Sequence, residues 1–313
     1  MAIDESNPER FQGEASMTQE STMSATEKAL RECPVIDSDE ARLAQKAADD
    51  AADLPPDRID VDPMKITQHW EKYTAENHEV WGLLYEKRME QLADFGSRVF
   101  LDGAEVIKLN KEQVPKLTEV NQRLQEFSNW ASWGVPGYLP AKAFFAFLAQ
   151  RQFPTTITVR PKFSMDYLPE PDIIHDVFGH VPLHANRIFA DFLQTFGKAA
   201  LYTNNAEHTE RLARLFWFTV EFGLIHEDGK TKLYGSGLIS SDGEGHHALE
   251  SKDVERRAFD LDRVCETTFE IDHYQPILYV LESFEQLKES MLKYAEKILE
   301  EEGRVDEIEH LRD

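Results

Sequence analysis

The chain has 313 residues, enough for one large domain or two ordinary ones, and 41% of them are hydrophobic, enough for a substantial core. Its 34 basic and 58 acidic residues give a net charge of −24, which argues against binding to nucleic acid or an anionic lipid surface. No apolar run approaches the ~20 residues of a membrane span, and the N-terminus lacks the features of a secretory signal. Two cysteines cannot form a disulfide framework or a structural zinc site. We therefore expect a cytoplasmic protein with no nucleic-acid or membrane partner.

Composition divides the chain into three segments. Residues 1–62 are rich in Ser, Glu, Asp and Ala and contain one aromatic residue, Phe11. Such a segment cannot bury enough apolar surface to offset the entropy that it loses on ordering. We therefore expect an acidic, largely disordered N-terminal extension over residues 1–62. A folded domain should follow over residues 63–300, and a C-terminal tail over residues 301–313.

The folded domain is predicted to be mostly α-helical with a few short β-strands. In its first stretch, apolar residues recur at three- and four-residue steps, which is the periodicity of a helix. The predicted helices cover residues 62–96, 111–130, 139–153, 207–227 and 284–303, and a further helix should follow the turn at 169–172. The run 153–160, which is rich in β-branched residues, predicts a strand, and residues 231–241 predict a strand followed by a loop that contains glycines. The amphipathic terminal helix should pack on its own domain.

Two histidines, His175 and His180, stand five residues apart in the segment EPDIIHDVFGHVPL. On a continuous α-helix, where each residue adds about 100°, a step of five turns the second side chain by about 140° away from the first. Both imidazoles can therefore face one site only if the helix ends or bends near Gly179, which this glycine and the following Pro182 permit. Taken alone, the pair is also consistent with two partly buried histidines of a polar helix.

A carboxylate that could complete a metal site lies in RLFWFTVEFGL, where aromatic and apolar residues flank Glu221. Burying an acidic side chain in such a run is costly unless it meets a positive charge or a metal. Two imidazoles and one carboxylate match the ligand pattern of non-haem iron(II), which leaves coordination positions open. A zinc-dependent hydrolase with the same three residues remains an alternative, as does a non-catalytic acidic binding protein.

Several longer motifs make the chain recognisable. EPDIIHDVFGHVPL, FWFTVEFGL and YGSGLISSDGE occur in this order, preceded by ENHEVWGLLYEKR, FLDGAEVIKLN and FFAFLAQRQFP. Together they resemble the tetrahydropterin-dependent aromatic amino acid hydroxylases, most closely their short bacterial phenylalanine-hydroxylating branch, over roughly residues 65–295. The resemblance implies the catalytic-domain fold of that family. It also implies that His175, His180 and Glu221 are the catalytic iron ligands.

The resemblance assigns further site residues. Those expected to contact the pterin are Gly137, Tyr138, Leu139, Phe144 and Asp176. Those expected to bind the amino acid substrate are Arg160, Asp172, Trp217, Phe222 and Ser240. Arg160 corresponds to the arginine that binds the substrate carboxylate, a task suited to the two parallel donors of a guanidinium. Without the resemblance, each of these residues could equally have a structural role.

The implied reaction uses iron(II), O2 and a tetrahydropterin, which is tetrahydrobiopterin or a related pterin, to convert L-phenylalanine into L-tyrosine. Trp217 resembles the phenylalanine and tyrosine branches, and Ile271 aligns with a position that is apolar in phenylalanine hydroxylases. An apolar pocket penalises a buried phenol, which favours phenylalanine as the substrate. Hydroxylation of phenylalanine at the meta position, or of tryptophan, remains an alternative. We expect a monomer, because the first 65 residues are too polar for a regulatory domain and few residues follow the last motif.

Overall fold

The computed structural model describes residues 34–165, 171–271 and 273–311. Its α-helices are α2 (Ser38–Asp50), α3 (Ala75–Phe95), α4 (Arg98–Val106), α5 (Leu117–Phe127), α6 (Ala141–Ala149), α7 (Arg187–Tyr202), α8 (Ala206–Phe216), α9 (Ser236–Ser240), α10 (Asp242–Glu250), α11 (Leu261–Glu266) and α12 (Phe284–Glu301). Its strands are β1 (Ala131–Gly134), β2 (Gln152–Thr155), β3 (Leu224–Glu227), β4 (Lys230–Leu233), β5 (Glu255–Ala258) and β6 (Ile277–Leu281). Two π-helical turns, η8 (Ile174–His180) and η10 (Trp217–Glu221), and a 3-10 helix, η9 (Val181–Ala185), complete the central part. The predicted class, mostly α with a few short strands, is confirmed.

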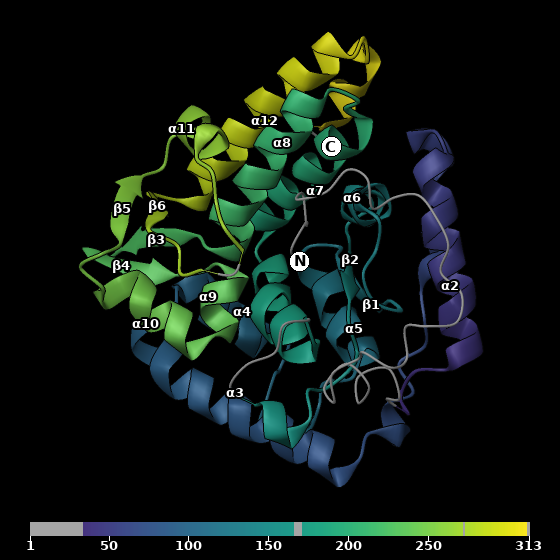
Figure 1. The fold of residues 1–313 in the computed structure, drawn as a ribbon, viewed down its shortest axis with the longest axis vertical. Coiled ribbons are helices and arrows are strands. Elements are labelled where there is room, and N and C mark those ends of the chain that lie inside the picture. The colour runs from purple at the N-terminus through teal and green to yellow at the C-terminus, as the bar shows by residue number, and fades with distance from the viewer. Residues whose placement is uncertain (1–33, 166–170, 272, 312–313) are drawn as a thin grey trace.

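The strands form two small sheets. In the larger one the order is β4-β3-β6-β5, with β3 antiparallel to β4 and parallel to β6, and β5 parallel to β6. The smaller one pairs β1 with β2 in parallel. Figure 1 shows the larger sheet at the left and α2 at the right edge of the molecule, with the other helices between and around them. The helices thus form the bulk of the fold; the larger sheet lies at one edge, whereas the smaller sheet lies among the helices, next to α5 and α6.

Helix α7 is the central element of the core. It packs against α6 on one side and against α12 on another. Most of its side chains are apolar and buried, so a helix with neighbours on several sides is the arrangement that removes them from water. Helix α12 turns its buried side chains Leu287, Met291, Ala295 and Ile298 inward. The predicted packing of the terminal helix on its own domain is confirmed.

The N-terminal segment differs in part from the expectation of disorder. Residues 1–33 lie outside the described residues, but residues 34–62 contain α2 and two short 3-10 helices, and a third begins at Asp62. Asp37 caps α2 by accepting from the backbone N–H groups of Asp39 and Glu40, each at 3.0 Å. Ala44 and Ala48 are buried in the domain core. Small alanines permit close packing without an aromatic anchor, and a search for large apolar residues misses this signal.

Two other predicted elements differ in extent. The run expected as a strand over 153–160 pairs only as far as Thr155. The expected glycine-punctuated loop contains helix α9, which buries Leu238 and Ile239 and packs against η8. Burial of these two side chains explains why a sequence rich in glycine and serine becomes helical there.

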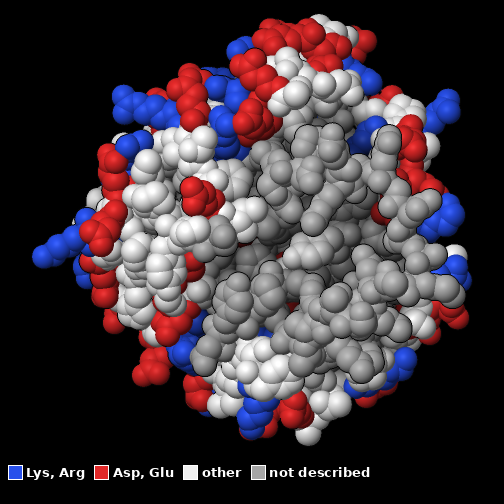
Figure 2. Space-filling model, viewed as in Figure 1, with Lys and Arg blue, Asp and Glu red and all other residues white. Residues whose placement is uncertain are grey.

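Acidic side chains are spread around the periphery of the face shown in Figure 2, with lysine and arginine interspersed among them. On the coloured part of this face the basic residues form no continuous patch. Across the residues that the structure describes, no helix combines the length and apolar character needed to cross a bilayer.

Candidate active site

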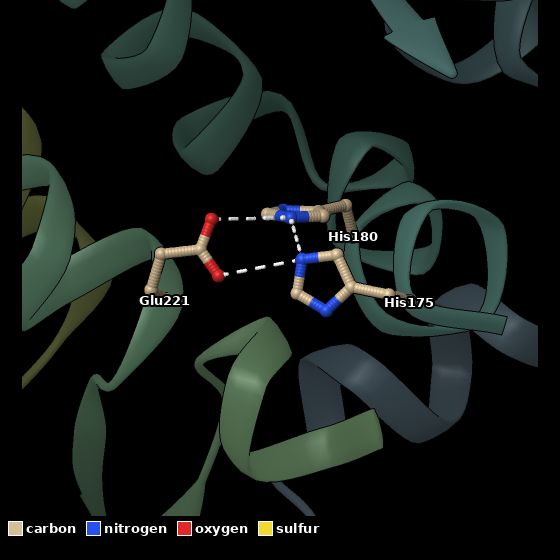
Figure 3. Close-up of side chains that lie close together, drawn as sticks. All are labelled: His175, His180 and Glu221. Atoms are coloured by element: carbon tan, nitrogen blue, oxygen red, sulfur yellow. Dashed lines mark hydrogen bonds and ion pairs between the residues drawn. The ribbon is translucent and has the colours of Figure 1, made fainter. Parts of the chain in front are cut away.

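Three side chains of metal-binding type meet in the interior of the domain (Figure 3). Nε2 of His180 lies 3.3 Å from Nε2 of His175 and 3.4 Å from Oε1 of Glu221. Nε2 of His175 lies 3.6 Å from Oε2 of Glu221. The ligand atoms all lie within 4.8 Å of one another, and the described residues contain no second cluster of this kind.

The five-residue spacing of the histidines is explained by the π-helical turn η8. In such a turn the backbone hydrogen bonds link residues five apart, so these residues lie one above the other. The predicted end of the helix near Gly179 agrees with the structure, in which η8 ends at His180. What aligns His175 with His180, however, is the widening of the helix before that end. Glu221 is the last residue of the second π-helical turn, η10, so both segments that supply ligands share this uncommon geometry.

Burial sets the charge state of the cluster. His180 and Glu221 are each 2% exposed. Burial lowers the pKa of His175 well below its ordinary value, which favours the neutral imidazole that a metal requires. Burial alone would raise the pKa of Glu221, but its contacts with the imidazoles of His180 and His175 help to hold it well below the usual range. A neutral imidazole at His175 and an ionised carboxylate at Glu221 result.

This donor set fits a divalent transition metal. Nitrogen and oxygen ligands about 2.0–2.2 Å from one ion are separated from each other by roughly 3.0–3.4 Å, and the observed separations are close to this range. Two imidazoles and a carboxylate on one face of an ion leave positions for other ligands. The cluster can therefore hold a metal whose remaining coordination positions are open to small molecules.

A pocket with about 400 Å³ of empty space, its open mouth included, adjoins the cluster. Its walls consist of Val135, Gly137, Tyr138, Leu139, Phe144, Phe153, Pro154, Thr156, Pro171, Asp176, His180, Phe216 and Glu221. All five residues predicted to contact a pterin are in this set, together with two of the three metal-binding residues. We call this cavity the pterin pocket.

The pterin pocket has an aromatic wall and a polar corner. Phe144 is 5% exposed and meets Phe216 edge to face, with ring centroids 5.8 Å apart. At the corner, Oδ2 of Asp176 accepts hydrogen bonds from the backbone N–H and the hydroxyl of Thr156, both at 2.7 Å. Burial raises the pKa of Asp176, although His180 and these hydrogen bonds oppose the shift. Sequence reasoning missed Thr156, whose only signal is its place after Pro154 in a predicted strand.

Arg160 and Asp172 form a buried ion pair beside η8. Nε and Nη2 of Arg160 donate to the two oxygens of Asp172, each at 2.9 Å, and Nη1 donates to the carbonyl of Met165 at 3.2 Å. Asp172 is fully buried and also accepts from the backbone N–H groups of Ile174 and His175. It thus fixes both the guanidinium and the start of η8. These contacts occupy three of the five N–H groups of Arg160, so donors remain for a ligand carboxylate.

The other predicted substrate residues, Trp217, Phe222 and Ser240, are not part of the pocket wall. The rings of Trp217 and Phe222 are 4.6 Å apart, and Trp217 also stacks on Phe269 at 4.4 Å. Ser240 Oγ is 3.1 Å from Nδ1 of His175. Ile271 is 44% exposed, so it cannot be a fully desolvated wall for a substrate ring. Ser240 thus contacts a metal-binding residue, and Trp217 and Phe222 pack against each other, whereas Ile271 is not buried.

Comparison with known proteins agrees with this geometry. The sequence model of the biopterin-dependent aromatic amino acid hydroxylases matches residues 65–305. The chain is 38% identical over 228 residues to phenylalanine-4-hydroxylase of Chromobacterium violaceum, covering 73% of this chain and 77% of that one. It is 37% identical over 243 residues to the enzyme of the same name from Caulobacter vibrioides, covering 78% of this chain and 83% of that one.

The chain belongs to the biopterin-dependent aromatic amino acid hydroxylases. A crystal structure of the Chromobacterium violaceum phenylalanine hydroxylase with bound iron(III) and 7,8-dihydrobiopterin superimposes with a TM-score of 0.72 at 36% identity. The alignment covers 77% of this chain and 88% of that chain. The predicted family and its catalytic-domain fold are confirmed, and the hydrolase and binding-protein alternatives are not favoured.

Proposed function

We propose that this protein hydroxylates L-phenylalanine to L-tyrosine, using iron, O2 and tetrahydrobiopterin or a related tetrahydropterin. The observation that carries the proposal is that His180 and Glu221 form part of the wall of the pterin pocket. A metal held there is next to any planar ligand that stacks on Phe144. Bacterial relatives named phenylalanine-4-hydroxylase, which share more than a third of their aligned residues with this chain, support the choice of substrate.

Each predicted site residue has a role in this proposal. His175, His180 and Glu221 hold the iron. Phe144 stacks on the pterin, while Gly137, Tyr138, Leu139 and Asp176 contact its edge. Arg160, held by Asp172, binds the substrate carboxylate, and its fixed guanidinium limits how the amino acid can lie. Trp217 and Phe222 contact the substrate ring, and Ser240 supports His175.

When bound, the iron and the tetrahydropterin supply O2 activation and the two electrons needed to insert one oxygen atom into the aromatic ring. The protein contributes orientation and proton placement. The Ser240 hydroxyl donates to the carbonyl of Ser236 at 2.7 Å, so it accepts from Nδ1–H of His175. This contact places the imidazole proton on Nδ1 and leaves the Nε2 lone pair for the metal.

The apolar surroundings of the site support phenylalanine as the substrate. Trp217, Phe222 and Phe269 present aromatic faces to one another, and apolar walls suit a ring without a hydroxyl group. The exposure of Ile271 removes one argument that the sequence suggested, so the choice rests on the aromatic residues and on the relatives.

We further propose that the protein acts as a cytoplasmic monomer. Support comes from its net charge of −24, its two cysteines and the burial of the apolar face of α12 within its own domain. Analytical ultracentrifugation of the full chain tests the monomer: one species near 36.0 kDa is expected, and a dimer would contradict it.

Product analysis tests the function. Purified protein would be given iron(II), a tetrahydropterin and O2 with phenylalanine, tyrosine or tryptophan in separate reactions, at low and high salt. Para-tyrosine from phenylalanine is the expected main product. Meta-tyrosine would keep phenylalanine as the substrate but overturn the ring position, and hydroxytryptophan would overturn the substrate assignment, although both would retain the hydroxylase chemistry. No hydroxylated product at any salt concentration, from protein that contains iron, would overturn the proposed function.

A further inference from the structure

Helix α9 contacts two of the three metal-binding residues through its first and last side chains. Ser236 Oγ donates to Oε2 of Glu221 at 2.7 Å, and Ser240 Oγ lies 3.1 Å from Nδ1 of His175. Residues four apart lie on the same face of a helix, so one short helix turns both hydroxyls toward the site. Ser240 has a role in the proposed function, whereas Ser236 has none so far.

Ser236 is fixed against Glu221 by close backbone approaches. It is fully buried. A side chain at Gly235 would place its Cβ 2.4 Å from the Glu221 carbonyl oxygen, so only glycine permits this approach. On the other side, a Cβ at Gly179 in η8 would lie 3.1 Å from the Ser236 carbonyl oxygen. Ser236 is thus held between the segment that supplies the histidines and the segment that supplies the carboxylate.

The Ser236 hydroxyl makes the two oxygens of Glu221 unequal. A serine has one proton to donate, and its other acceptor within reach, the Val220 carbonyl, is farther away at 3.3 Å. A charged carboxylate at 2.7 Å is the stronger acceptor, so the Ser236 hydroxyl donates its hydrogen bond to Oε2 of Glu221. Oε1 faces Nε2 of His180 at 3.4 Å and receives no hydrogen bond from Ser236.

We propose that Ser236 is a positioning residue of the metal site, because its hydroxyl holds Oε2 of Glu221 and leaves Oε1 as the atom offered to the metal. The inference rests on the proposed function, in which Glu221 is a metal ligand. A carboxylate that uses one oxygen leaves more of the metal open to O2 than a carboxylate that uses both. Ser236 acts only through Glu221 and touches neither substrate nor pterin in this proposal.

Metal binding to the full-length, metal-free protein tests the proposal without any need for turnover. The affinity for Co(II) would be measured by competition with a chelator, and the visible absorption of bound Co(II) would report its coordination number. Ser236→Ala and Ser236→Gly should each weaken Co(II) binding by about 10–100-fold, the usual effect of losing a hydrogen bond to a metal ligand, and should change the spectrum. Ser128→Ala is the matched control, since Ser128 is also buried and donates to a carbonyl, that of Leu124.

The outcomes separate this inference from the proposed function. If folded Ser236→Ala protein binds Co(II) with wild-type affinity and a wild-type spectrum, the proposed role of Ser236 is overturned, but the proposed function is not. Equal losses in Ser128→Ala would also overturn it, as would failure of both Ser236 variants to fold, because the hydroxyl would then serve stability. If wild-type protein binds no Co(II), or if His180→Ala binds it as tightly as wild type, the proposed function itself fails.

Discussion

The two sides of the pterin pocket are held in different ways. On one side, His180 and Glu221 are each 2% exposed and lie on π-helical turns inside the core. On the other side, Tyr138 lies in a loop and is 47% exposed. The carbonyl of Tyr138 accepts a hydrogen bond at 3.3 Å from Gln45 of α2, a helix outside the family match at residues 65–305. The metal side therefore depends on the core, and the pterin side depends partly on an added segment.

The added segment also contacts the helix that carries Phe144. Lys142, near the start of α6, donates to the carbonyl oxygens of Ala52 and Leu54 just after α2. These contacts join the loop, α6 and α2 at the mouth of the pocket. The difference teaches that metal affinity and pterin affinity should respond to different residues, and the predictions for His180 and for the pterin side test this separation directly.

The largest effect is expected for His180→Ala. Loss of one of three metal ligands should lower iron affinity and tyrosine formation by more than about 100-fold, because even residues that only support ligands cost 10–100-fold. Pterin binding, measured by calorimetry, should change far less. Thermal unfolding of the metal-free variant provides the control for folding. If pterin affinity fell as much as iron affinity, the two sides of the pocket would not be held independently.

The next effect is expected for Asp172→Ala. This change leaves the Arg160 guanidinium without its buried partner and removes the acceptor of two N–H groups at the start of η8. Breaking a buried ion pair from one side costs about 3–5 kcal/mol of unfolding free energy. Urea unfolding measures this cost, and the KM for phenylalanine should rise.

The matched control for Asp172→Ala is an exposed pair on α2. The side chains of Lys46 and Asp50 are 70% and 61% exposed. Lys46→Ala should therefore change the unfolding free energy by less than about 1 kcal/mol. Equal losses of unfolding free energy in Asp172→Ala and Lys46→Ala would show that the buried Arg160–Asp172 pair stabilises the fold no more than an exposed pair does.

A smaller effect is expected at the pterin side. Gln45→Ala and Lys142→Met each remove hydrogen bonds that hold the mouth of the pocket. A single hydrogen bond contributes about 0.5–1.5 kcal/mol, so the KM for the pterin should rise about two- to fivefold. Metal affinity and the KM for phenylalanine should not change, and Lys46→Ala on the same helix should leave all three values intact. An unchanged pterin KM in both variants would contradict the role of α2.

The last effect is a dependence of stability on pH at Glu244, which lies in α10, the helix that follows α9. Burial raises the pKa of Glu244 from its ordinary 4.5 to about 7. Between these values the folded protein binds more protons than the unfolded chain, so stability falls as the pH rises through this window. Glu244→Gln removes the ionisable group and therefore also this loss of stability at higher pH. The melting temperature of the variant relative to wild type should therefore increase between pH 5 and pH 8, and a constant difference would contradict the shift.

The sequence predicted the ligand set but not the geometry that assembles it. His175, His180 and Glu221 were predicted because a carboxylate in an apolar run needs a partner and because the motifs around all three residues resemble those of a known family. The π-helical turns could not be predicted, because a change from four- to five-residue hydrogen bonding depends on packing around the helix and leaves no periodic signal.

Similar reasons explain the other differences. The packing of helix α2 on the domain was missed because its core contacts are made by alanines, which a search for large apolar residues ignores. Ser236 was missed because a serine between two glycines has the composition of a loop. Its role emerges only once α9 is seen to pack against η8. In these cases the determining interactions join segments far apart in the chain.

The most direct test of the central claim is metal-dependent product formation. Metal-free protein would be loaded with Fe(II) or with Zn(II) and given phenylalanine, O2 and a tetrahydropterin, and para-tyrosine and pterin oxidation would be measured together. The account predicts tyrosine formation in step with pterin oxidation for the Fe(II) protein, none for the Zn(II) protein and none for His180→Ala. Tyrosine formation that is independent of iron, or that persists in His180→Ala, would contradict it.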